Sequence, residues 1–314
     1  MKIKYLYPAT LQSCLAVFFL SIFFSVANAQ EASSGKLYKS SVFTPANGFT
    51  SGIEGPAVDK AGILYVVNFQ RQGTIGQVTP SGDASIFIEL PEGSVGNGIR
   101  FNSHGNMLIA DYTMHNILKV DMSSKAISVF ANEQHMSQPN DIAVDKYDRL
   151  YASDPDWKAG TGRIWRIDTN GAVSLLKDSL GTINGIEVSP DGKILYVNES
   201  VQRKVWAYHL SADGTISNKR LLIEFPDFGM DGMRCDSKGN LYITRHGKGT
   251  VVKVSPRGKI LEEITLTGKS PSNLAFGGTD GCTVYVTLQD QGNLETFRVP
   301  VPGREWKMQH SKTK

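Results

Sequence analysis

The chain has little cysteine and almost no excess of either charge. Three cysteines occur in 314 residues, and 33 basic residues are balanced by 30 acidic ones. The Cys-x-x-Cys and Cys/His spacings of structural zinc sites are missing. The concentrated positive charge that nucleic-acid binding requires is missing as well. We therefore predict no zinc-cysteine site and no nucleic-acid partner.

Long apolar runs are also missing, apart from one near the N-terminus. Residues 14–27 are apolar except for two serines, follow two lysines, and lead into Ala27-Asn28-Ala29. This run is shorter than the roughly 20 residues of a membrane-spanning helix. The pattern predicts a cleaved secretory signal over residues 1–29, with an uncleaved anchor as the alternative. We expect an exported mature chain, periplasmic or secreted, that forms a single domain over residues 30–314 and has no membrane contact.

The mature chain would keep two cysteines and a nearly neutral charge. Cleavage removes Cys14 and two lysines, which lowers the net charge from +3 to +1. Cys235 and Cys282 fall in different repeats of the pattern described next. Although an exported chain can form disulfides, we predict that both cysteines are free.

One short pattern recurs along the chain. Each copy begins with a residue whose side chain carries an oxygen, and glycine usually follows it. A predicted strand of alternating apolar and polar residues comes next. The six copies begin at Glu54, Asn97, Asn140, Asn184, Asp231 and Ser272. A spacing of 41 to 47 residues is typical of repeat architectures. We call these six residues the column.

Each repeat contains the same succession of strands and tight turns. In the first, a turn at residues 59–62 leads to the apolar strand 63–67. Four antiparallel strands per repeat predict an all-β, six-bladed β-propeller. The last repeat lacks its fourth strand, and residues 37–43 can supply that strand and close the ring. We find no amphipathic helix pattern and interpret the basic tail from Arg304 as a solvated terminus.

The column can be interpreted in two ways. Asn-Gly and Asp-Gly are common in β-turns, but Glu54 is not a turn former. In a blade the first strand lines the central channel, so the column would form a ring at one mouth. Carboxylate and amide oxygens without thiolate or imidazole are typical of calcium or magnesium sites. We predict one divalent cation held by Glu54, Asn140, Asn184 and Asp231, acting as a Lewis acid or as a structural plug.

The ordered motifs resemble the senescence marker protein / gluconolactonase / luciferin-regenerating enzyme family of six-bladed propellers, over residues 37–306. The motifs that carry the resemblance are Glu54-Gly55-Pro56, Pro139-Asn140-Asp141, Asn184-Gly185-Ile186, Asp231-Gly232-Met233, the run 241–250 and Pro302-Gly303-Arg304-Glu305-Trp306. The resemblance implies a metal, commonly Ca²⁺ with Mg²⁺, Mn²⁺ or Zn²⁺ as alternatives, held at Glu54, Asn184 and Asp231. It makes Asp231 the candidate catalytic base or nucleophile, and it gives Asn140 a role with metal or substrate.

One position departs from the family pattern. Animal members carry arginine two residues before the third column residue, where this chain has Gln138. Arg245 and His246 are candidate replacements as donors to substrate, although His246 can equally be a solvated loop residue. We also expect Asn97, Gln138 and Ser272 to contact substrate. The departure suggests a substrate other than a plain aldonolactone.

The predicted function is hydrolysis of a small-molecule lactone by an exported, metal-dependent enzyme. Two alternatives remain open. One is a non-catalytic propeller that binds a ligand or a protein and carries a structural calcium. The other is hydrolysis of phosphotriesters or other esters at the same site.

Overall fold

The computed structural model describes Met1 and residues 36–311. The predicted signal peptide, residues 1–29, therefore lies outside the described residues except for Met1. The chain divides into two units at Leu37, and the fold below is that of the unit from Tyr38 onward. No helix in the described part of the chain is both long and apolar enough to cross a bilayer.

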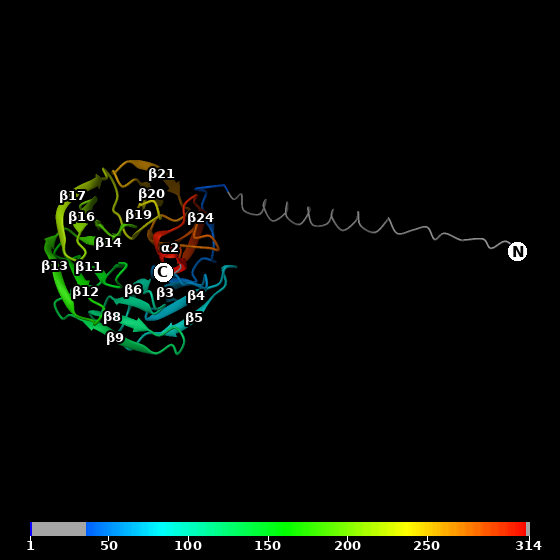
Figure 1. Cartoon of the computed structure of the whole chain (residues 1–314), viewed down its shortest axis with the longest axis horizontal. Coiled ribbons are helices and arrows are strands. Elements are labelled where there is room, and N and C mark those ends of the chain that lie inside the picture. The colour runs from blue at the N-terminus through cyan, green and yellow to red at the C-terminus, as the bar shows by residue number, and fades with distance from the viewer. Residues whose placement is uncertain (2–35, 312–314) are drawn as a thin grey trace. The chain divides into compact units, whose positions relative to one another are not determined.

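Six four-stranded antiparallel sheets follow one another around a ring (Figure 1). Blade one contains β2 (Phe49–Val58), β3 (Leu64–Phe69), β4 (Thr74–Val78) and β5 (Ala84–Glu89). Blade two contains β6 (Gly96–Phe101), β7 (Met107–Asp111), β8 (Asn116–Val120) and β9 (Ile127–Asn132). Blade three contains β10 (Ile142–Val144), β11 (Leu150–Asp156), β12 (Thr161–Ile167) and β13 (Val173–Leu180).

The remaining blades repeat this order. Blade four contains β14 (Ile183–Val188), β15 (Ile194–Glu199), β16 (Lys204–Leu210) and β17 (Ile216–Glu224). Blade five contains β18 (Met233–Cys235), β19 (Leu241–Arg245), β20 (Thr250–Val254) and β21 (Ile260–Thr265). Blade six contains β22 (Pro271–Gly277), β23 (Thr283–Leu288), β24 (Asn293–Arg298) and the N-terminal strand β1 (Ser41–Val42). The predicted six-bladed propeller is confirmed.

The ring closes in the predicted way. β1 pairs antiparallel with β24, with Ser41 opposite Thr296 and Val42 opposite Glu295. This pairing supplies the fourth strand of blade six and covers an edge that would otherwise be open.

The core lies between neighbouring blades. Inner strands such as β14 are buried along their whole length, whereas the outer strand β21 is almost entirely exposed. One apolar cluster joins Val205 of blade four to Ile243 and Val252 of blade five. Burying each such side chain stabilises the fold by about 1.5–3 kcal/mol. Packing between blades therefore fixes the inner strands around the channel.

Both cysteines of this unit are buried and free, as predicted. Cys235 ends the inner strand β18, and Cys282 immediately precedes β23.

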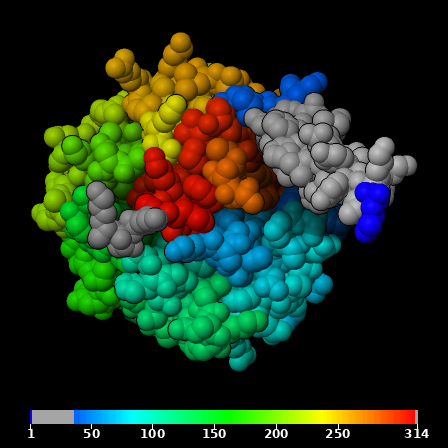
Figure 2. All heavy atoms as spheres, turned by 45° about the vertical axis from the view of Figure 1, so that its right-hand side comes forward, coloured from blue at the N-terminus to red at the C-terminus, as the bar shows by residue number. Residues whose placement is uncertain are grey.

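The C-terminal segment differs from its prediction. It is not a solvated tail, because residues Arg304–His310 form the helix α2. Arg304 is buried and donates hydrogen bonds to Val144 O (2.7 Å) and to Glu187 Oε1 (3.3 Å). Figures 1 and 2 show the C-terminal segment (red) over the centre of the ring. The helix thus covers the end of the channel toward which the inner strands run.

Candidate functional site

Four of the six column residues lie where the pairing of the inner strands is interrupted. The register of β14 against β15 shifts between Ile183 and Ile186, which places Asn184 in a bulge. Corresponding shifts surround Glu54, Asn97 and Ser272. A bulge re-aims a side chain out of the sheet, and here it aims toward the channel mouth.

Close contact between blades explains the glycines that follow the column. The amide N of Gly185 donates to Asp231 O of the next blade (3.1 Å), and that of Gly232 donates to Ser272 O (2.6 Å). A Cβ on Gly185 would lie 2.6 Å from the same Asp231 oxygen. The column residues themselves do not adopt positive φ. Four column residues, Glu54, Asn97, Asn184 and Ser272, lie within strands and not in β-turns. Where a glycine follows, it allows neighbouring inner strands to approach closely.

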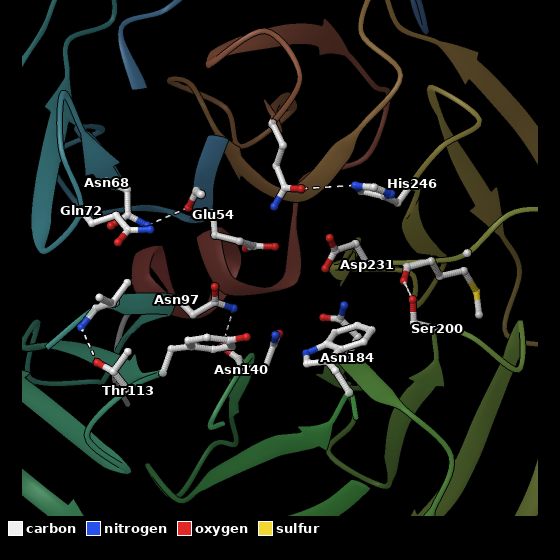
Figure 3. Close-up of a pocket in the computed structure, with 18 residues that line it drawn as sticks. Glu54, Asn68, Gln72, Asn97, Thr113, Asn140, Asn184, Ser200, Asp231 and His246 are labelled. Atoms are coloured by element: carbon white, nitrogen blue, oxygen red, sulfur yellow. Dashed lines mark hydrogen bonds between the residues drawn. The ribbon is translucent and has the colours of Figure 1, made fainter. Parts of the chain in front are cut away.

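A pocket of about 490 Å³ opens at this mouth, a size within the range of small-molecule sites. Five of the six column residues line it, namely Glu54, Asn97, Asn140, Asn184 and Asp231. Figure 3 shows Glu54, Asn184 and Asp231 pointing into one central space from different blades. The fold therefore brings together all four residues that we predicted as metal ligands.

Glu54 is a buried carboxylate with few compensating donors. Its Oε2 accepts hydrogen bonds from Gly55 N (2.5 Å) and from Asn273 Nδ2 (2.9 Å). Burial, reinforced by the negative charge of Asp141, raises the pKa of Glu54 to about 7. A bare carboxylate in this position is electrostatically costly.

Asp231 lies beside Glu54 and shares this cost. Burial and the nearby Glu54 carboxylate raise the pKa of Asp231 well above its ordinary value, and a hydrogen bond with Asn184 offsets part of the shift. Unlike Glu54, Asp231 stays partly exposed to the pocket. Its backbone is fixed by Asn198, whose Nδ2 donates to Asp231 O (2.6 Å). Two carboxylates in contact repel each other, and a divalent ion bound by both would relieve that repulsion.

The two asparagines of the column, Asn140 and Asn184, also indicate a cation site. The Oδ1 atoms of Asn140 and Asn184 are buried and have no hydrogen-bond partner in the part of the chain that the structure describes. An orphaned buried carbonyl oxygen is uncommon and costs free energy unless a ligand satisfies it. With the two carboxylates, these atoms make an all-oxygen donor set suited to a hard cation. The residues present therefore fit the implied metal.

Within residues 36–311, no group of three or more His, Cys, Asp or Glu side chains is placed to hold a metal ion. The donor set at this mouth instead combines two carboxylates with two amide oxygens.

The predicted substrate-binding residues separate into two groups. Asn97 and His246 line the pocket, as Asn140 does. The Nδ2 of Asn97 donates to Asn140 O (3.1 Å), and His246 Nε2 lies 3.2 Å from Gln289 Oε1. These residues are placed to meet a ligand.

The other three do not line the pocket among the described residues. Ser272 is fully buried, and its Oγ donates to Ile53 O (2.8 Å). Arg245 is buried against Asp227, with 2.8 Å between Nη2 and Oδ1. Gln138 forms a hydrogen bond with the hydroxyl of Tyr112, a residue of the pocket wall. Contacts with protein groups thus occupy these three side chains.

Sequence reasoning did not find the charged floor of the channel. Asp141 is fully buried, and its carboxylate receives Arg100 Nη2 (3.2 Å) and Arg234 Nη1 (2.9 Å). Arg100 also pairs with Glu305 of α2 (2.6 Å). Although burial acts to raise it, the charges of Arg234 and Arg100 hold the pKa of Asp141 below its ordinary value. The sequence does contain a pattern that indicates these charged residues, because Arg100 and Arg234 each lie three residues after a column residue.

Glu187 and Arg304 complete this floor. They are 3.3 Å apart and both buried. Burial raises the pKa of Glu187 even though Arg304 acts in the opposite direction. We call the six residues Arg100, Asp141, Glu187, Arg234, Arg304 and Glu305 the floor cluster.

Known proteins share both the sequence pattern and the fold. Residues 31–290 match the SMP-30/Gluconolactonase/LRE-like region. A gluconolactonase of Zymomonas mobilis is 27% identical over 285 residues, covering 78% of this chain and 79% of the relative. A 6-deoxy-6-sulfogluconolactonase of Pseudomonas putida is 31% identical over 157 residues, which cover 48% of this chain and about half (54%) of that relative.

Among solved structures, the calcium-binding protein regucalcin of Agrobacterium tumefaciens superposes with a TM-score of 0.70 at 22% identity. The match covers 84% of this chain and 97% of that one. This structural likeness establishes the fold. Since the family pattern covers most of the residues that build the propeller, the chain belongs to the SMP-30/Gluconolactonase/LRE-like family.

Proposed function

We propose that the protein is a metal-dependent hydrolase of lactones. The observation that carries the proposal is the meeting of two carboxylates, Glu54 and Asp231, with two orphaned amide oxygens at the mouth of one pocket. The names of the gluconolactonase relatives support the choice of substrate class. We also propose that the chain is exported, on the basis of residues 1–29.

Glu54, Asn140, Asn184 and Asp231 would hold the cation. Ca²⁺ is the first choice because all donors are oxygens, with Mg²⁺, Mn²⁺ and Zn²⁺ as alternatives. When bound, a divalent cation supplies Lewis-acid polarisation of a carbonyl oxygen.

Asp231 is the residue placed to accept a proton from the attacking water. It is the member of the carboxylate pair that stays partly exposed to the pocket, whereas Glu54 is buried against Gly55 and Asn273. In lactone opening, water adds its oxygen to the carbonyl carbon and gives a proton to Asp231. The ring C–O bond breaks, and the ring oxygen takes up a proton as it becomes a hydroxyl. Asn198 holds the Asp231 backbone in position for this transfer.

The other lining residues orient the substrate and limit access of water. Asn97 and His246 offer hydrogen-bonding groups on different sides of the pocket (Figure 3). Tyr112 and Trp157 supply apolar walls. Together they hold a lactone ring against the carboxylate pair.

The test uses the purified mature chain in a pH-stat with δ-valerolactone and δ-gluconolactone. We expect turnover in calcium, loss in EDTA and recovery when calcium is restored. Asp231→Asn should lower kcat by about 10³-fold or more, since general-base catalysis contributes about 10²–10⁴-fold. Asp178→Asn is the matched control, because Asp178 is half exposed on the outer strand β13.

Turnover that survives both EDTA and Asp231→Asn would contradict the metal-dependent mechanism. Calorimetry with calcium tests the other alternative. Tight calcium binding without turnover of any lactone or ester would instead identify a binding propeller with a structural ion.

A further inference from the structure

The pocket mouth is apolar on one side. In every blade the loop between the second and third strands reaches this mouth. In blades two, three and four these loops present Met114, Trp157 and Val201 to solvent, each between 42% and 63% exposed. Trp157 also lines the pocket itself. Three consecutive blades therefore carry a large exposed apolar side chain at corresponding positions.

The corresponding loops of the other three blades are polar. They contribute Gln72 from blade one, His246 from blade five and Gln289 from blade six, and all three side chains line the pocket. The rim of the pocket thus has an apolar arc over blades two to four and a polar arc over the other three blades, although Thr113 and Ser200 add polar groups to the lining below the apolar arc. A plain polyhydroxylated ring would leave the apolar arc in contact with water.

Phe228, on the connection between β17 and β18, extends the apolar arc. It is 48% exposed and has a φ of 43°, a left-handed conformation that is unfavourable for a bulky residue. The buried Arg245 holds this connection, because its Nη2 donates to Asp227 Oδ1 (2.8 Å) and its Nε donates to Gly229 O (3.4 Å). A phenyl group held at the mouth in a strained conformation indicates a functional constraint.

Large exposed apolar side chains elsewhere have a simpler explanation. Val129, Leu175, Leu221, Ile260 and Leu261 belong to outer strands, where one face of the strand meets solvent. Tyr147 lies on the β10–β11 turn, at the end of the channel away from the pocket. Met114, Trp157, Val201 and Phe228, which we call the apolar rim, are distinct because they lie on segments that also supply lining residues of the pocket, although only Trp157 itself lines it.

We propose that the substrate is a lactone carrying an alkyl or aryl substituent, which packs against the apolar rim while the ring lies at Asp231. This inference rests on the proposed function and specifies its substrate class. Trp157 connects the two regions, because it lines the pocket and is also exposed at its edge. The polar arc with His246 and Gln289 meets the polar edge of the ring.

A homologous series of lactones tests the inference. The mature chain in calcium is assayed with δ-hexalactone, δ-octalactone and δ-decalactone, which carry methyl, propyl and pentyl groups, and with δ-gluconolactone. We expect kcat/KM to rise by about threefold to fourfold per added methylene until the rim is filled, since each buried methylene contributes about 0.8 kcal/mol. δ-Gluconolactone should be the poorest substrate of the four.

Variants of the rim locate the effect. Trp157→Ser should lower the ratio of kcat/KM for δ-decalactone over δ-hexalactone by about tenfold or more. Phe228→Asn should lower the same ratio less, since asparagine tolerates the left-handed backbone and keeps the connection in place. Tyr147→Ser is the matched control and should leave the ratio unchanged, because Tyr147 is equally exposed but far from the pocket.

The outcomes separate this inference from the proposed function. Turnover of all four lactones with a flat dependence on chain length overturns the inference and leaves the proposed function standing. Absence of all turnover overturns the proposed function. Calorimetric binding of the 6-methyl and 6-pentyl δ-lactams then decides the inference independently. A preference for the pentyl compound that Trp157→Ser removes supports the rim, and equal affinities overturn it.

Discussion

The mouth and the floor of the channel are built by the same inner strands but differ in how their buried charges are paired. Strand β6 presents Asn97 at the mouth and Arg100 at the floor, and the chain entering β18 presents Asp231 and then Arg234. At the floor, three arginines meet three carboxylates. At the mouth, two carboxylates meet each other.

This difference in charge pairing indicates different roles for the floor and the mouth. A buried charge is tolerated when a partner compensates it, and the floor cluster supplies its partners from within the chain. The mouth holds two carboxyl groups in contact and two orphaned amide oxygens, and no arginine or lysine among the described residues pairs with those carboxyl groups. The floor therefore closes the channel, whereas the mouth is organised for a ligand that the chain does not contain.

The largest expected effect comes from the floor. Asp141→Asn should lower the free energy of unfolding by about 3–5 kcal/mol, because it leaves Arg100 and Arg234 buried without their shared carboxylate. Urea denaturation measures the change. Asp280→Asn is the matched control, since Asp280 pairs with Arg298 at a half-exposed position and should cost about 1 kcal/mol or less. Equal effects for the two variants would remove the distinction between a paired floor and ordinary surface pairs.

The same kind of substitution at the mouth should act with the opposite sign. Glu54→Gln removes the repulsion with Asp231 and the cost of a buried charge. In EDTA it should raise the free energy of unfolding by on the order of 2 kcal/mol, in line with the raised pKa of Glu54. Calorimetric titration should also show at least about a 100-fold loss of calcium affinity. A destabilised variant in EDTA would mean that the Glu54 charge is compensated after all.

The most gradual effect, at most about 1.4 kcal/mol for one pH unit and one proton, is a pH dependence that calcium should abolish. The folded pKa of Glu54, about 7, exceeds its ordinary value of 4.5, so the folded protein keeps a proton that the unfolded chain has released. Stability in EDTA should therefore fall as pH rises from about 4.5 to 7, by at most about 1.4 kcal/mol per pH unit for each proton. Asp231 contributes with the same sign.

Scanning calorimetry in EDTA and in calcium measures this dependence. Calcium keeps both mouth carboxylates ionised, so the difference between the two Tm profiles isolates them from Glu187 in the floor. The difference should widen as pH rises and should shrink in Glu54→Gln. A difference independent of pH would place the calcium elsewhere.

Much of the architecture could be predicted from sequence because it depends on short-range patterns. Strand alternation and tight turns are local, and their repetition at 41 to 47 residues already implies six equal units and a closing N-terminal strand. The column was found for the same reason, since each member occupies the same position in its repeat. Its members converge because a closed ring brings equivalent positions together.

The directions of individual side chains depend on neighbours that are distant in sequence. Arg245 and His246 are adjacent, yet Arg245 is buried against Asp227 and His246 lines the pocket. Ser272 belongs to the column by spacing, but its hydroxyl donates to Ile53 O, 219 residues earlier in the chain. Alternation within one strand cannot specify either outcome.

By itself, therefore, the sequence determined the blade count, the closure of the ring and the oxygen-bearing column, because each follows from a periodic local pattern. Only the tertiary structure decided which column members reach the pocket and that α2 covers the floor. It also decided that Asp141 has two arginine partners while Glu54 and Asp231 have none among the described residues. Those facts depend on contacts between blades, where charge and burial are set by residues tens to hundreds of positions apart.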